Sequence, residues 1–132
     1  MNREAVVAEF VDRFPVLRAP TDEFFTEWGP DDGLFVWVDV LFRFVLWPLL
    51  DAEREDPQAL RAVFDAMESL AGRVDGEIDT FVATGILEVL ADSESRLRRA
   101  WPYMQPRTRG LLLEIETFLG RSHPELWGPA EP

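Results

Sequence analysis

The chain has 132 residues, of which 47% are hydrophobic and 12% aromatic, so it holds enough apolar material for one folded domain and is not disordered. Its formal net charge of −12 argues against nucleic acid and anionic membranes as partners, because both attract basic surfaces. It has no cysteine, which excludes disulfides, thiolate metal sites and a cysteine nucleophile.

The N-terminal quarter predicts two helices. Residues 3–14 place apolar side chains at helical spacing, and a proline ends the pattern. A short second helix is expected to open at Pro20, with Thr21 as its N-cap and Phe24, Phe25 and Trp28 as its apolar residues. A Gly/Pro/Asp turn over residues 29–33 then leads into the most apolar part of the chain.

Residues 34–50 are apolar on almost every side when they are drawn as a helix. Asp39 and Arg43 lie one helical turn apart, in the favourable order of acid before base. Such a helix is buried, spans a membrane or is covered by a partner. The run is shorter than the roughly 20 residues that a span needs, so we expect no membrane helix. Its apolar residues form two stripes, Leu34, Val38, Leu41, Phe42 and Val45 on one side and Val36, Val40, Phe44 and Trp47 on the other.

Four more helices are predicted. One is capped by Asp56 and ends at Gly72, one covers about 75–91, one is capped by Asp92 and Ser93 and runs to about Ala100, and one runs from Pro106 to Gly120. Strand alternation is not sustained anywhere, so the expected fold is all-α. We expect a compact bundle or short solenoid-like array of about six to seven helices around the central helix, with one domain over 1–120 and a Pro/Gly-rich tail over 121–132. The last helix is expected to line one apolar face with Leu111, Leu112, Ile115, Phe118 and Leu119.

Candidates for chemistry are scarce. The single histidine, His123, lies in the tail, and no nucleophile elbow, phosphate loop or zinc-binding motif occurs. Asp75, Glu77 and Asp79 have the first spacings of a calcium loop, but the glycine and the final glutamate that such a loop needs are missing. We therefore expect these acids to lie in the first turn of a helix, and we expect no enzyme activity, metal site or cofactor. Glu68 and Glu88 are expected on solvated faces.

Four segments resemble a family of small, largely uncharacterised bacterial all-helical proteins: VLRAPTDEFFTEWGPDDGLFVWVDVLFRFV, ALRAVFDAMESL, IDTFVATGILEVLAD and MQPRTRGLLLEIETF. The resemblance covers residues 16–120 and leaves out the first helix and the tail. It implies a HEAT-like helical domain with no known activity. Small acidic proteins of this kind also resemble immunity proteins, which neutralise a toxin by covering its active site.

The first functional hypothesis is an immunity protein that binds a basic bacterial toxin through an acidic surface. In an antiparallel arrangement, the turn before the central helix and the start of the 75–91 helix share one end. The acids expected there as the partner-binding surface are Asp31, Asp32, Asp75, Glu77 and Asp79. The absence of a signal-peptide pattern at the N-terminus predicts a cytoplasmic location.

The alternatives place function on the central helix. One is an enzyme or small-molecule binder with a pocket at Asp39 and Arg43, surrounded by aromatics that include Trp37 and Trp47. The simpler structural interpretation is that Asp39 and Arg43 form an ion pair on the only solvent-facing side of the helix, and that the aromatic residues lie in the core. A further alternative is a homodimer that buries the second apolar stripe.

Overall fold

The computed structural model describes residues 3–28, 33–73 and 76–121, and within these ranges helices account for nearly every residue and no strand is present. The first two helices are α1 (Arg3–Arg13) and α2 (Arg18–Trp28), joined by the 3-10 turn η1 (Pro15–Leu17). The central helix consists of α3 (Leu34–Leu41), η2 (Phe42–Leu46) and α4 (Trp47–Asp51). The predicted all-α class is confirmed.

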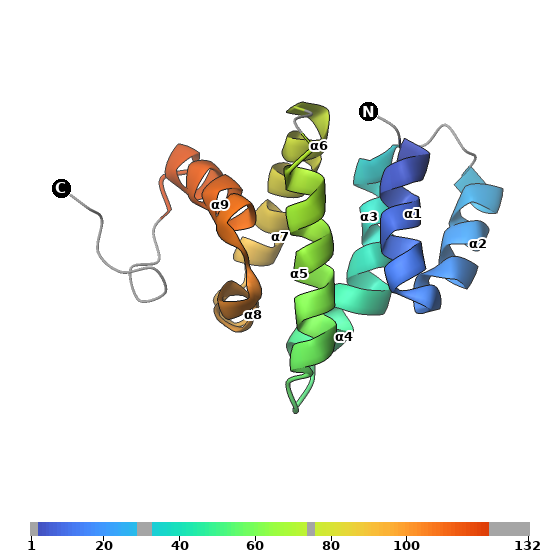
Figure 1. Ribbon diagram of the computed structural model, residues 1–132, viewed down its shortest axis with the longest axis horizontal. Helices are drawn as coiled ribbons and strands as arrows, with labels where there is room; N and C mark the ends of the chain where they lie inside the picture. The colour runs from blue at the N-terminus through green and yellow to red at the C-terminus, as the bar shows by residue number, and fades with distance from the viewer. Residues whose placement is uncertain (1–2, 29–32, 74–75, 122–132) are drawn as a thin grey trace.

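The C-terminal half adds four helical rods. They are α5 (Pro57–Ala71), the compound helix α6 (Gly76–Thr80), η3 (Phe81–Leu87) and α7 (Glu88–Ala91), then α8 (Glu94–Ala100) with the 3-10 turn η4 (Trp101–Tyr103), and α9 (Pro106–Phe118). The rods form an array with α2 at one edge and α9 at the other (Figure 1). The segment η3 packs against α3, α5 and α9, so the middle of the array is the core. The expected bundle of six to seven helices is therefore confirmed.

Each rod sends large apolar side chains into one continuous core. Phe10, Trp37, Phe64 and Phe81 are fully buried. Burying a side chain of this size stabilises the folded state by about 1.5–3 kcal/mol relative to leaving it exposed. The core also orients the central helix. Val38, Leu41, Phe42 and Val45 of its first stripe are buried, while Val36 and Phe44 of its second stripe stay 48% and 43% exposed.

The central helix contains a five-residue π-helical segment, η2, which ends two residues before Pro48. The backbone N–H of Trp47 donates to the carbonyl of Phe42, five residues earlier. A proline inside a helix has no N–H to donate, and its ring crowds the carbonyl four residues earlier. The wider turn relieves that crowding, and it lets the helix continue through the proline to Asp51.

The expected start of the second helix is wrong. The helix begins at Arg18, so Thr21 lies inside it and is buried rather than acting as an N-cap. Pro20 is tolerated there because the N–H groups of the first helical turn have no partner within the helix. The Thr21 hydroxyl instead accepts a hydrogen bond from the Trp37 indole Nε1, at 3.1 Å. This bond ties α2 to the central helix.

Some side chains that the sequence analysis placed on particular faces lie elsewhere. Glu68 is not simply solvated, because its carboxylate accepts hydrogen bonds at the start of α9. Phe118 and Leu119 were expected on the apolar face of the last helix but are 84% and 41% exposed, at the C-terminal end of α9. The caps predicted at Asp56 and Ser93 are confirmed: their side chains accept from the backbone N–H groups of Ala59 and Arg96.

Where the chain is described, none of its helices has the length and hydropathy to cross a lipid bilayer.

Candidate functional site

The clearest candidate for a binding site is a hollow between α2 and the central helix, which we call the α2–α3 groove. One wall comes from α2, and the other wall and floor come from α3 and η2. The two elements contact each other, and α2 forms one edge of the array (Figure 1). The groove is lined by Pro20, Glu23, Phe24, Glu27, Val36, Asp39, Val40, Arg43 and Phe44.

The floor of the groove is apolar and follows the second stripe of the central helix. Val36, Val40 and Phe44 succeed one another at four-residue intervals, so they share one side of the helix. Val40 is buried at the bottom, while Val36 and Phe44 are nearly half exposed. Phe24 of α2 packs against the core from the opposite wall. The stripe that the sequence predicted to need a cover is therefore only partly covered by the chain itself.

The rim of the groove is acidic. Glu23 and Glu27 lie one turn apart on α2, and both are exposed. On the central helix the guanidinium of Arg43 lies 3.8 Å from the carboxylate of Asp39, with side-chain exposures of 67% and 71%. At this exposure the ion pair contributes at most about 1 kcal/mol to stability and leaves both groups accessible to a partner.

The four residues of the predicted pocket are not gathered at one place. Asp39 and Arg43 form part of the groove rim. Trp37 is fully buried and bonded to Thr21, so its ring belongs to the core. Trp47 stacks on Phe42, with ring centroids 4.5 Å apart, and lies beneath the guanidinium of Arg96 at 3.8 Å.

The predicted five-carboxylate surface is described only in part. Asp31, Asp32 and Asp75 lie outside the described residues. Glu77 and Asp79 do lie in the first turn of α6, as expected. The starts of α3 and α6 lie at the same end of the array, as the antiparallel arrangement requires (Figure 1).

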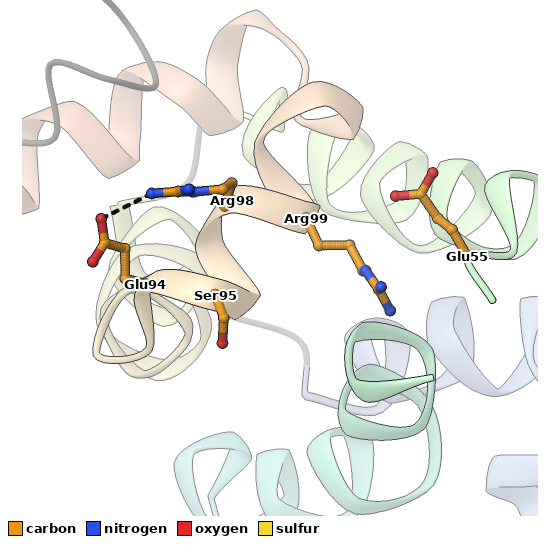
Figure 2. A pocket seen from close by; sticks show the side chains of 5 residues that line it. All are labelled: Glu55, Glu94, Ser95, Arg98 and Arg99. Carbon is orange, nitrogen blue, oxygen red and sulfur yellow. Dashed lines mark hydrogen bonds and ion pairs between the residues drawn. The ribbon is translucent and has the colours of Figure 1, made fainter. Parts of the chain in front are cut away.

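A second hollow lies beside α8, and its charged groups are engaged within the fold (Figure 2). Arg98 pairs with Glu94 at 3.1 Å, and Arg99 donates to the main-chain carbonyls of Leu50 and Ala52. Figure 2 shows Arg98 and Arg99 pointing away from each other, so the two guanidinium groups do not converge on one ligand. The remaining lining residues are Glu55 and Ser95.

Glu55 of this hollow is itself engaged. Its carboxylate accepts a hydrogen bond from the hydroxyl of Tyr103 at 2.8 Å, which raises the pKa of that phenol.

The sequence analysis missed the acidic wall on α2. It treated Phe24 as part of the apolar side of a short helix and did not assign Glu23 and Glu27 to any site. The i, i+4 spacing of these two glutamates was the available signal, because it places them on one side of a helix. Among the described residues, no group of three or more histidine or acidic side chains is arranged to hold a metal ion.

Residues 7–120 match the model of the family described as domain of unknown function (DUF7674), and the chain belongs to that family. The match begins inside α1, which corrects the expectation that the first helix lies outside the family resemblance. No curated protein and no solved structure gives a significant match.

Proposed function

We propose that this DUF7674 protein is a non-catalytic interaction module that binds a basic protein partner, most concretely a bacterial toxin that it neutralises as a cytoplasmic immunity protein. The observation that carries the proposal is the α2–α3 groove, which combines a half-exposed apolar floor with a rim of three carboxylates and one guanidinium. Apolar contact supplies affinity at such a surface, and the carboxylates steer a basic partner toward it.

The distribution of the arginines supports an acidic outer surface. Several guanidinium groups are held within the fold by carboxylates, main-chain carbonyls or aromatic rings, and they do not line the groove, so they do not neutralise its rim carboxylates. The arginines held in this way are Arg96, Arg99, Arg109 and Arg121. With a formal net charge of −12, the protein attracts a basic partner over about one Debye length.

Capture of the partner from lysate, at about 0.05 M and about 0.5 M salt, tests this proposal. The groove variant Glu23→Arg/Glu27→Arg should lose a basic, salt-sensitive partner that the wild type retains. The matched control is Glu53→Arg/Glu114→Arg, which changes the net charge equally at two exposed acids outside the groove. Equal retention by both variants would contradict the assignment of the groove.

Inhibition is then measured with the captured partner. An equimolar amount of the wild-type protein should abolish the partner's toxicity or enzymatic activity, and the groove variant should not. If the captured partner has no activity that the protein suppresses, the immunity role is refuted while the interaction role stands.

A homodimer through the same stripe is the second candidate, because Val36 and Phe44 are apolar and exposed. A two-fold interface would bring the rim carboxylates of both copies together, which opposes close packing. Light scattering of the full chain at micromolar concentration distinguishes the two: a monomer excludes a tight homodimer.

A further inference from the structure

We infer that the α2–α3 groove receives an amphipathic helix of the partner, with an apolar stripe flanked on both sides by arginine or lysine. This inference rests on the proposed function and specifies the shape and charge of the segment that docks.

The apolar floor has the dimensions of a helix-binding site. Val36 and Phe44 are eight residues apart on the central helix, which corresponds to about 12 Å along its axis. A partner helix presents side chains i, i+4 and i+7 along a similar length, and it fits between two neighbouring helices by placing its ridge into their groove. Addition of a partner strand needs the edge of a sheet, and the described residues contain no strand to provide one.

The charges on the two walls define the flanks of that helix. Glu23 and Glu27 line the α2 side, and Asp39 lines the opposite side next to Arg43. Basic residues on the α2 side of the apolar stripe would meet two carboxylates. On the other side they would meet the carboxylate of Asp39, which is shared with Arg43. A second copy of this chain would instead bring carboxylates toward carboxylates, so charge complementarity favours a basic occupant.

Phe44 is the groove side chain whose replacement best tests docking of a helix. Its ring is 43% exposed at one end of the floor, so it can be removed without opening a large cavity in the core. Phe118 on α9 is a matched control, because it is 84% exposed and does not line the groove. Phe44→Ser and Phe118→Ser therefore remove the same apolar ring at two exposed sites, and only the first lies in the groove.

The probe is a synthetic peptide of about 16 residues that forms an amphipathic helix, with leucines at i, i+4 and i+7 and arginines on both flanks. A second peptide has the same composition with the leucines redistributed so that no apolar stripe forms. Both are titrated into the isotopically labelled full chain while backbone resonances are followed by NMR. The amphipathic peptide should shift resonances of α2 and residues 36–44 and should gain helicity on binding.

Quantitatively, the amphipathic peptide should bind at least about tenfold more tightly than the redistributed one. Phe44→Ser should weaken binding by about tenfold or more, and Phe118→Ser should leave it unchanged. Equal affinity for both peptides, or shifts that map outside the groove, would overturn the inference.

The natural partner separates this inference from the proposed function. Phe44→Ser should weaken its binding, and a partner that needs Glu23 and Glu27 but tolerates Phe44→Ser would refute helix docking alone. Failure to capture any basic partner would instead refute the proposed function.

Discussion

The carboxylate of Glu68 on α5 accepts hydrogen bonds from both the backbone N–H and the hydroxyl of Thr108 on α9, each at 2.9 Å. It also accepts from the backbone N–H of Arg107 at 2.9 Å. Gln105 occupies the N-cap position of α9 but does not cap the helix with its side chain. That side chain donates a hydrogen bond to Asp65 instead. A carboxylate 40 residues earlier in the chain therefore accepts hydrogen bonds from the free N–H groups at the start of α9, and this links α9 to α5.

Replacing Glu68 by alanine should lower the free energy of unfolding by about 1–2 kcal/mol, because two helix-start N–H groups lose a charged acceptor. Urea unfolding at neutral pH measures this loss. Glu114→Ala is the control, since that glutamate is exposed on α9 and its removal should change stability by less than about 0.5 kcal/mol. Equal effects of the two substitutions would contradict a capping role for Glu68.

The same cap should make stability depend on pH below the ordinary carboxyl range. Burial alone would raise the pKa of Glu68, but the hydrogen bonds from Arg107 and Thr108 outweigh it and lower the pKa below its ordinary value of 4.5. Because the folded-state pKa is depressed, the stabilisation is complete above pH 4.5 and is lost as the pH falls toward the folded-state pKa.

Glu68→Gln should therefore cost more stability at pH 7 than at about pH 3. Urea midpoints of both proteins at the two pH values measure the difference. The pKa of Asp51 is also lowered by its hydrogen bond to Arg96, so the variant should retain some acid sensitivity. An identical cost at both pH values would show that the Glu68 charge does not contribute.

Local features of this fold could be predicted from the sequence, and contacts between distant segments could not. The caps at Asp56 and Ser93 follow from neighbouring residues, so they were predicted correctly. The capping of α9 by Glu68 could not be predicted, because the partners of Glu68 lie on another helix and no neighbouring residue identifies them. The π-helical segment before Pro48 was also missed, since a proline in a helical pattern equally predicts a kink or an end.

The candidate site shows the same division. The pairing of Asp39 and Arg43, and the excess apolar stripe beside it, were visible in one segment of sequence. Trp37 was assigned to the pocket because it lies near Asp39 in sequence, but its direction on the helix sends it into the core. The wall formed by Glu23 and Glu27 depends on how α2 packs, which local periodicity does not determine.

Arg96 should matter more to stability than its neighbour Arg98. Arg96 makes two hydrogen bonds to Asp51, at 2.9 and 2.8 Å, and stacks over Trp47, whereas Arg98 forms an exposed pair with Glu94 on the same helix. Arg96→Lys should cost about 1 kcal/mol or more, because an ammonium group cannot reproduce the planar, two-pronged contact.

Arg98→Lys is the matched control and should change the free energy of unfolding by less than about 0.5 kcal/mol. Thermal and urea unfolding of both variants measure the difference. If both substitutions cost the same, the contact between α8 and α4 does not depend on the guanidinium of Arg96.

The bond between Trp37 and Thr21 should be detectable by a double-mutant cycle. Trp37→Phe leaves the buried Thr21 hydroxyl without its donor, and Thr21→Val removes the acceptor while keeping the shape. Each single change should cost about 1–3 kcal/mol, and the double variant should cost less than their sum by about 0.5 kcal/mol or more. Additive costs would mean that the hydrogen bond does not couple α2 to the central helix.

Truncation of two apolar residues of α9 should change stability by very different amounts. Leu112 is fully buried against the core, so Leu112→Ala should lower the free energy of unfolding by about 2–5 kcal/mol through lost burial and the cavity left behind. Phe118 is 84% exposed, so Phe118→Ser should change stability by less than about 0.5 kcal/mol. Urea unfolding curves of the full chain measure both. A loss of more than about 1 kcal/mol for Phe118→Ser would show that its ring is covered in solution, because an exposed ring has little burial to lose.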